Sequence, residues 1–278
     1  MPSLFFCKMN KVIYIMAIYQ RHESTKIVLD YYRNLGIDLI IAGSEGVISQ
    51  DLAKGFKYIE VANSPLTYKN NAMLKAVQKY EHDAVVLLGS DDLICPNTVE
   101  FYKSLQTDKV FGFSDIYFYS TEHKQLGYLE LDKHFGAGRF FPKSVLEKCN
   151  YKAWQRQLDR GCDTETERYF KTLGIEFERI SIKKNNLFLI DIKHDYNISS
   201  KNIIFACKKE NFNIMAKKVG KQTANKVEQL TFTPKSVLNG YVRVICNDKN
   251  ESLKGRTLLL PEEKANLIVA KGWGVYEG

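Results

Sequence analysis

Ala84-Val85-Val86-Leu87-Leu88-Gly89-Ser90-Asp91-Asp92 is the stretch of this sequence that decides the fold. Its first five residues form an apolar run, which is typical of a strand buried inside a parallel sheet. Two adjacent carboxylates follow almost at once. Open α/β sheets bind ligands at the carboxyl ends of their strands, and carboxylate oxygens hold divalent cations beside phosphates. The stretch therefore predicts an α/β sheet with an acidic edge, and we expect an enzyme that handles a phosphorylated substrate.

Strand-like and helix-like segments alternate before this stretch, which favours β-α-β units and a largely parallel sheet. Polar or glycine-rich residues follow each predicted strand, so we expect the loops to converge at one edge of the sheet. The predicted strands are 11–17, 38–42, 58–62 and 84–88, and the predicted helices are 22–35 and 69–79, the latter starting near Asn63-Ser64-Pro65.

The second half of the chain is more mixed. Residues 110–120 and 126–131 predict a hairpin, 143–149 and 164–173 two helices, and 177–182 and 187–192 further strands. We expect an α/β fold of mostly parallel sheet with helices on both faces, followed by a small α+β appendage. The predicted units are a catalytic domain at 1–200, a basic helical segment at 201–235 and a compact module at 236–278.

Composition favours a folded, soluble protein. The chain has 278 residues, of which 45% are hydrophobic, enough for one large core. The apolar run at 12–19 is shorter than the roughly 20 residues of a membrane span, and Lys8 interrupts the start of any signal peptide. The six cysteines lack paired spacing, so we expect reduced thiols in a cytoplasmic protein.

Positive charge is unevenly distributed. The formal net charge is +8, and residues 201–226 contain seven lysines but only one acid, Glu210. Such a segment forms either an ordinary solvated helix face or a contact to an anionic partner such as nucleic acid, acidic glycan or a membrane surface.

Four segments together resemble a known family. The N-terminal strand, Gly43-Ser44-Glu45-Gly46, Lys69-Asn70-Asn71-Ala72 and Leu88-Gly89-Ser90-Asp91-Asp92 follow one another as in the GT-A fold of nucleotide-sugar-dependent glycosyltransferases, especially those of family two. The resemblance covers about residues 10–200. It implies that an Asp-x-Asp-type motif binds Mn²⁺ or Mg²⁺, and through it the donor diphosphate, so that the metal neutralises charge on the leaving group.

This chain departs from the family's motif at one position. A common form is Asp-x-Asp-Asp, but the first position here is Gly89. The resemblance therefore puts metal ligation on Asp91 and Asp92 alone. Either one carboxylate binds the metal while the other hydrogen-bonds ribose or sugar, or the site recruits another ligand, for which His194 is the candidate, because related enzymes often bring a C-terminal His or Asp back to the metal. The alternatives are a helix cap for the acidic pair and an ordinary surface or core-edge histidine for His194.

The resemblance also implies a donor site at the ends of the early strands. Tyr19 and Arg21 would cradle the nucleotide, Glu45 would meet the base, and Lys69 would favour the diphosphate by charge pairing. Glu45 as a loop acid and Lys69 as a solvated residue remain alternatives. The expected donor-binding residues are Tyr19, Arg21, Ser44, Glu45, Lys69, Asn71 and Asp91.

The acceptor side should supply a general base. Asp163 lies where inverting enzymes of this fold carry a carboxylate at a helix start, with Asp159 and Glu165 as competitors. Asp163 can equally cap that helix. The expected acceptor-pocket residues are Gly138, Arg139 and Trp154, although tryptophan is most often a packing residue.

The leading hypothesis is a metal-dependent glycosyltransferase that moves a sugar from a nucleotide donor, a UDP-sugar by preference, to a hydroxyl acceptor. The acceptor is either a glycan or a hydroxymethylated pyrimidine in phage DNA, because the C-terminal tail looks like modules common in bacteriophage proteins. A nucleotidyltransferase and a non-catalytic nucleotide-sugar-binding protein are the alternatives. The former usually has a glycine-rich loop after its first strand, and Ala17-Ile18-Tyr19-Gln20-Arg21 has none.

Overall fold

The computed structural model describes residues 9–63, 65–193 and 201–230, together with three strands at 241–246, 257–261 and 274–276. The chain divides into two compact units, Met1–Thr231 and Phe232–Gly278. The larger unit carries every predicted site residue. His194 lies outside the described residues.

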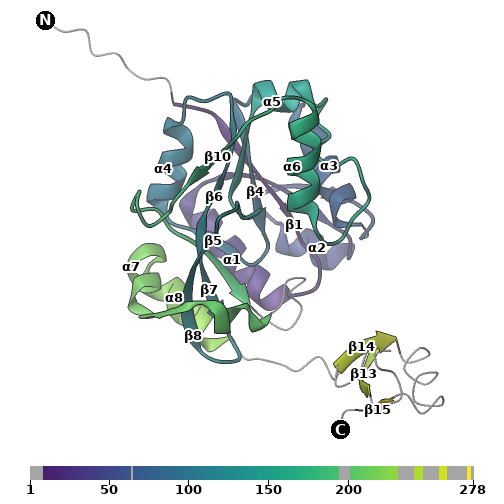
Figure 1. Cartoon of the computed structure of the whole chain (residues 1–278), viewed down its shortest axis with the longest axis vertical. Coiled ribbons are helices and arrows are strands. Elements are labelled where there is room, and N and C mark those ends of the chain that lie inside the picture. Colours follow the sequence, from purple (N-terminus) through teal and green to yellow (C-terminus); the bar gives the residue numbers. More distant parts are fainter. Residues whose placement is uncertain are drawn as a thin grey trace, which may run out of the picture. The chain divides into compact units, whose positions relative to one another are not determined.

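A seven-stranded sheet forms the centre of the larger unit (Figure 1). Four parallel strands at its middle and one edge follow the predicted alternation, and antiparallel β9 separates them from β6 and β10. The α/β fold with a mostly parallel sheet is therefore confirmed. In sheet order the strands are β10 (Phe177–Ile180), β6 (Val110–Phe113), β9 (Arg139–Pro142), β4 (Ala84–Gly89), β1 (Val12–Ala17), β2 (Asp38–Gly43) and β3 (Lys57–Glu60).

Helices cover both faces of this sheet, because side chains on each strand alternate between two cores. Tyr14 and Met16 of β1 face the core that includes Val28 of α1, whereas Ile13 and Ile15 face the other. The first face carries α1 (His22–Leu35) and α4 (Pro96–Ser104), and the second carries α3 (Leu66–Val77), α5 (Lys143–Lys148) and α6 (Cys162–Thr172). The short helix α2 (Val47–Leu52) follows β2 and contacts α1.

A second sheet lies beside the first and was not predicted as a separate sheet. The run at 110–120 divides at Ser114, so that β6 joins the main sheet while β7 pairs with β8 and β11 in the second. Its strands, in order, are β12 (Lys208–Glu210), β8 (Gln125–Glu130), β7 (Asp115–Ser120), β11 (Leu189–Lys193) and β5 (Asp92–Ile94). The β7–β8 hairpin agrees with the prediction.

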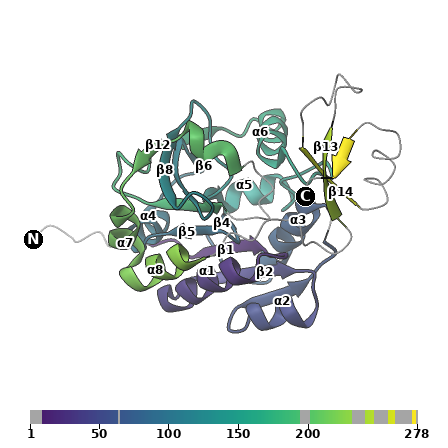
Figure 2. The same cartoon turned by 90° about the horizontal axis from the view of Figure 1, so that it is seen from below.

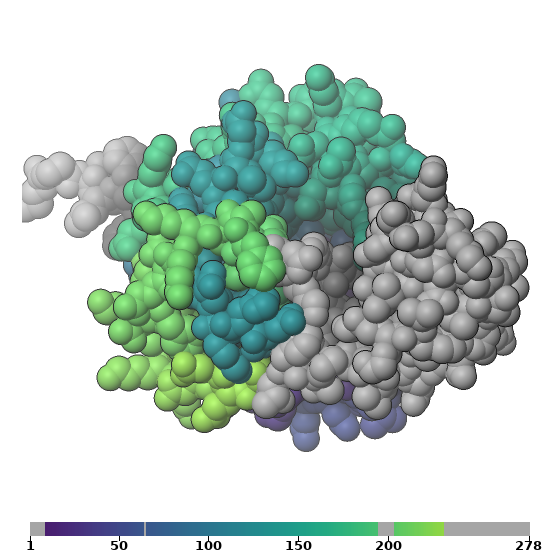
Figure 3. Space-filling view, turned by 60° about the horizontal axis from the view of Figure 1, so that its bottom comes forward, coloured from purple at the N-terminus to yellow at the C-terminus, as the bar shows by residue number. Residues whose placement is uncertain are grey.

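The segment predicted as one basic helix is divided. It contains the 3₁₀ helix η1 (Lys201–Ala206), strand β12, and helices α7 (Asn213–Val219) and α8 (Lys221–Gln229). Gly220, at φ 88°, separates the two helices, and α8 buries Ala224 and Val227 while contacting α1 (Figure 2). In Figure 3 the green residues of this segment lie against the teal β7–β8 hairpin, consistent with the β12–β8 pairing.

The smaller unit contains a three-stranded antiparallel sheet in the order β14 (Thr257–Pro261), β13 (Tyr241–Cys246), β15 (Gly274–Tyr276). The sequence predicts a compact module here without marking strand β14. Among the described helices, none combines the length and apolar character that crossing a bilayer requires.

Asp115 joins the second sheet to the turn that leads into β11. This carboxylate is fully buried and accepts hydrogen bonds from the Tyr128 hydroxyl at 2.7 Å, the Ser181 hydroxyl at 2.8 Å, and the backbone N–H groups of Ile182 and Lys183 at 2.7 and 3.1 Å. One side chain therefore fixes three separate parts of the chain, and its removal leaves buried donors without partners.

We expect Asp115→Ala to lower the free energy of unfolding by about 3 kcal/mol or more, because each orphaned buried donor costs about 1–3 kcal/mol. Asp132→Ala is the matched control. Asp132 is almost fully exposed and, among the described residues, pairs with Arg179, so its loss should cost less than about 1 kcal/mol. Urea denaturation of both variants measures the difference, and equal costs would contradict the role of Asp115.

Candidate functional site

Three aspartates, one from the turn after β4 and one each from β5 and β11, come together at the carboxyl end of β4. Asp91 lies in the turn between β4 and β5, Asp92 begins β5, and Asp191 lies directly opposite Asp92 on the antiparallel strand β11. Directly opposed residues on neighbouring strands point to the same face of the sheet. One carboxylate oxygen from each aspartate lies within 4.8 Å of those of the other two, a spacing that a single divalent cation could bridge.

Gly89 makes room for this cluster. A Cβ at position 89 would lie 2.8 Å from an Asp91 carboxylate oxygen and 2.9 Å from one of Asp92, too close for a side chain. The Gly89 N–H instead donates a 2.5 Å hydrogen bond to the Asp92 carboxylate. The missing first acid of the motif therefore has a physical reason, because Asp92 folds back over the position where that acid would stand.

Two cations balance part of the cluster's charge. Arg21 pairs with Asp91 at 2.5 Å, and the buried Lys193 pairs with Asp191 at 2.5 Å. Burial raises the pKa of Asp92 well above its usual range, and the carboxylates of Asp91 and Asp191 raise it further. Burial also raises the pKa of Asp191 to about 6, although Lys193 opposes the rise. The mutual repulsion of these carboxylates favours the binding of a further cation among them.

The aspartates line a cavity of about 510 Å³, within the size range of small-molecule sites. Opposite walls come from the loop before β9, with Gly136 and Ala137, and from the segment at 159–163. Ser90 also lines the cavity, and its buried hydroxyl has no hydrogen-bond partner among the described residues. A buried polar atom without a protein partner is typical of a site that a ligand completes.

Of the three predicted base candidates, Asp163 and Asp159 line this cavity. Asp163 is half exposed in the first turn of α6, and its carboxylate lies 3.9 Å from Arg139. Asp159 accepts a 2.8 Å hydrogen bond from the Leu66 N–H at the start of α3, which makes it a helix cap. Glu165 is buried and pairs with Arg168 at 2.8 Å. Asp159 and Asp163 are both accessible at the cavity, and Asp159 is the one whose carboxylate is engaged by the start of α3.

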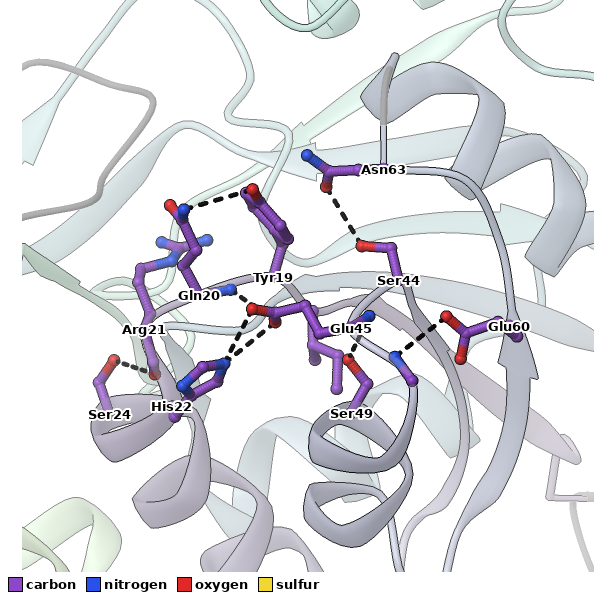
Figure 4. A network of polar contacts seen from close by, with 12 residues as sticks. Tyr19, Gln20, Arg21, His22, Ser24, Ser44, Glu45, Ser49, Glu60 and Asn63 are labelled. Carbon is purple, nitrogen blue, oxygen red and sulfur yellow. Dashed lines mark hydrogen bonds and ion pairs between the residues drawn. The ribbon is translucent and has the colours of Figure 1, made fainter. Parts of the chain in front are cut away.

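The loop after β1, which carries Arg21, has an unusual conformation, and its side chains form a polar network with Glu45 (Figure 4). Gln20 and Arg21 both adopt the left-handed region, at φ 53° and 47°, which non-glycine residues rarely do. Glu45 stabilises this turn, since its carboxylate accepts the Gln20 N–H at 2.8 Å and contacts His22 Nε2 at 3.0 Å. Glu45 therefore holds the loop. Local strain of this kind clusters at functional sites.

Lys69 lies beneath the same loop. It is buried, and its amine donates hydrogen bonds to the Ile18 carbonyl at 3.1 Å, the Ser44 hydroxyl at 2.7 Å and the Asn63 side chain at 3.2 Å. The amine also lies 5.3 Å from the centre of the Tyr19 ring. Burial lowers the pKa of Lys69 to about 8, although nearby Glu45 and Glu60 oppose the change. Tyr19, Ser44 and Lys69 thus form one cluster beyond the ends of β1 and β2, of which Figure 4 shows Tyr19 and Ser44.

Besides Tyr19, Ser44, Glu45 and Lys69 of the cluster beyond the strand ends, four further predicted residues do not line the cavity. Asn71 and Trp154 line a different one, where the Asn71 amide bonds the Trp154 backbone and the Trp154 indole N–H donates to the Cys162 carbonyl at 3.1 Å. Gly138 packs against Phe113 and Tyr102, and Arg139 is fully buried. These residues support the walls of the site from behind.

Sequence reasoning missed Asp191 and Asn70. Asn70, not Asn71, faces the cavity, because neighbouring residues on a helix point in directions about 100° apart. Asp191 stood in the same segment as His194, but only strand pairing reveals that it opposes Asp92. Its signal in the sequence was an acid inside an otherwise apolar strand, Leu189-Ile190-Asp191-Ile192.

Comparisons with known proteins give structural similarity alone. No protein-family model matches the chain, and no curated protein matches it. Among solved structures, a CMP:2-keto-3-deoxy-manno-octonic acid synthetase complexed with CTP aligns at TM-score 0.43 and 13% identity, covering 70% of this chain and 96% of that one. A putative nucleotide-diphospho-sugar transferase from Desulfovibrio desulfuricans G20 aligns at 0.42 and 12%, covering 81% and 100%. The inositol-1-phosphate CTP transferase from T. maritima aligns at 0.43 and 13%, covering 81% and 99%.

The lowered pKa of Lys69 predicts a specific pH dependence. Between about pH 8 and pH 10 the unfolded chain keeps the lysine proton while the folded protein has lost most of it, so folding stability due to Lys69 rises with pH. The free energy of unfolding of the native protein should therefore increase relative to that of Lys69→Met across this window. Urea denaturation at pH 7.5 and 9.5 measures the difference, and identical pH dependence in both proteins would contradict it.

Gly89→Ala should weaken Mn²⁺ binding at least tenfold, because the added methyl group displaces the Asp91 and Asp92 carboxylates. Asp163→Ala is a control from the same cavity whose carboxylate lies outside the cluster, and it should change Mn²⁺ affinity less than twofold. Calorimetric titration with MnCl₂ measures both. Unchanged affinity in Gly89→Ala would rule out a metal on this cluster.

Proposed function

We propose that this chain is a divalent-cation-dependent glycosyltransferase that uses a nucleotide-sugar donor, a UDP-sugar by preference. The observation that carries the proposal is one cavity lined both by the three clustered aspartates and by Asp163. Such a cavity supplies a cation site for a leaving diphosphate and a separate carboxylate for an acceptor hydroxyl, which are the two requirements of glycosyl transfer.

The carboxylate ligands of the cluster fit Mg²⁺ or Mn²⁺. Asp91, Asp92 and Asp191 offer only oxygen ligands, which these hard cations prefer. A bound cation would neutralise charge that develops on the departing nucleoside diphosphate. It would also relieve the repulsion among the three carboxylates. His194, predicted as a ligand, stays a prediction because it lies outside the described residues.

Arg21, which lines the cavity, is suited to bind the donor's phosphates. It now pairs with Asp91, and a cation bound to the cluster would compete for that carboxylate and leave the guanidinium for a phosphate oxygen. Arginine favours phosphate through its planar fork of donors. The unpartnered Ser90 hydroxyl adds a neutral hydrogen-bonding group in the same cavity.

Asp163 is the group that we propose as the base. It accepts the acceptor's hydroxyl proton while the hydroxyl oxygen attacks the sugar carbon, and the bond to the diphosphate breaks. Arg139, fully buried behind Gly136 and Asp163, would keep this carboxylate oriented. A Cβ at position 136 would lie 1.9 Å from an Asp163 oxygen, so the glycine permits the carboxylate to reach this place.

Nucleotidyl transfer is the alternative activity, and the experiment must distinguish it from glycosyl transfer. The β1 loop has no glycine-rich phosphate cradle, and Glu45 already fixes its backbone. Release of pyrophosphate from a nucleoside triphosphate and a sugar phosphate would identify a nucleotidyltransferase and overturn the proposal.

We expect the native protein to hydrolyse at least one of a panel of UDP-, GDP-, ADP- and CMP-sugars slowly, only with Mn²⁺ or Mg²⁺ present and not in EDTA. Asp91→Asn with Asp191→Asn should lower this rate at least 100-fold, since it removes two of the three charges that hold the cation. Asp132→Asn, an exposed acid outside the site, should leave it unchanged. Full activity in EDTA would contradict the proposal.

A further inference from the structure

A second cavity of about 570 Å³ lies on the outer side of α3. One wall is the helix itself, where Thr67, Asn71 and Lys75 recur every four residues and therefore share a face. The opposite wall is the segment at 150–157, which follows α5. None of the roles proposed above uses this cavity.

The cavity is cationic. Lys75, Lys152 and Arg156 line it, no carboxylate does, and none of the three cations forms an ion pair with a described residue. Three unpaired cations around one concave surface attract an anion and give it several charge-assisted hydrogen bonds.

The far wall is rigid. Asn150 and Tyr151 both adopt the left-handed region, at φ 50° and 54°, and the Tyr151 hydroxyl bonds His82 at 3.0 Å. The Asn71 amide holds the Trp154 backbone at both ends, at 2.7 and 3.3 Å. A bulky residue in the left-handed region is a strained arrangement of the kind found at ligand clamps.

The remaining lining suits a sugar. Exposed Tyr68 offers an aromatic ring at one side, and the amides of Gln78, Gln155 and Gln157 offer donors and acceptors together. Amides match hydroxyl groups, which both donate and accept, and an aromatic face packs on the apolar face of a ring. The volume is that of a small-ligand site, whereas a nucleic-acid duplex needs an open basic surface.

Helix α3 separates this cavity from the catalytic one. Leu66 and Asn70 face the catalytic cavity, while Thr67 and Asn71, each one residue further, face the second. The segment between α5 and α6 also passes from one cavity to the other, since Gln157 lines the second cavity and Asp159 the first. Thr67 fixes this crossing, because its hydroxyl accepts the Leu158 N–H at 2.8 Å.

We propose that the second cavity binds an anionic saccharide, a sugar that carries a carboxylate or a phosphate. Its position one helix width from the catalytic cavity makes it the site for a distal acidic unit of the acceptor, an assignment that rests on the proposed glycosyltransferase function. The binding itself does not depend on that function.

Calorimetry without donor or metal tests the binding. Glucuronate and glucose 6-phosphate should bind the native protein at least tenfold more tightly than glucose or inorganic phosphate, and their relative affinities distinguish a carboxylate site from a phosphate site. Lys75→Ala, Lys152→Ala and Arg156→Ala combined should weaken both at least tenfold. All three residues are exposed, so the variant should keep its fold. Lys79→Ala, Lys148→Ala and Lys171→Ala combined remove the same charge from exposed positions outside the cavity and should change binding less than twofold.

Several results would overturn the proposal. They are equal weakening in the two triple variants, phosphate binding as tight as that of glucose 6-phosphate, and displacement of glucuronate by duplex DNA. Asp91→Asn with Asp191→Asn should bind glucuronate normally, and a loss there would assign the sugar to the catalytic cavity. If glucuronate binds as expected while no nucleotide sugar is hydrolysed, the second site stands and the proposed catalytic function fails.

Discussion

The antiparallel pairing of β11 with β5 is the constraint on which the candidate site depends. It sets Asp191 opposite Asp92 across two strands that are nearly a hundred residues apart in sequence. The Tyr32 hydroxyl, in the core beneath, donates to the Asp92 carbonyl and accepts the Ile94 N–H, so α1 fixes the short strand β5. Further along, Asp115 anchors the turn that leads into β11. A slip of one residue in this register would turn Asp191 to the opposite face.

Local sequence patterns predict the framework well. Strands β1, β2 and β4 and helix α1 lie where the apolar periodicity and Gly36 place them, because each is a continuous element whose boundaries are marked by turn residues. The parallel sheet follows from their alternation with helices. Lys69 and Ser44 also contact one another, as expected of residues that follow neighbouring strands.

Long-range pairing explains most of what the sequence does not predict. Nothing local marks the division of the 110–120 run between two sheets or the folding of residues 201–230 onto the core. The face of a helix on which a residue lies is equally hard to predict from the sequence. An error of one position assigns Asn71 to the cavity that Asn70 lines. Trp154 and Arg139 have side chains typical of binding sites, yet the packing around them accounts for their burial.

Gly89 has a consequence for how such sites are recognised. A search that scores a linear motif counts this chain as one acid short, whereas the folded protein has its third acid on another strand. Replacing Gly89 with the aspartate of the common motif would not complete the site, since the neighbouring carboxylates already fill the space for that side chain. What has to be preserved here is the arrangement of the three carboxylates in space. The effect of a substitution at position 89 on the site therefore depends on which residue stands at position 191.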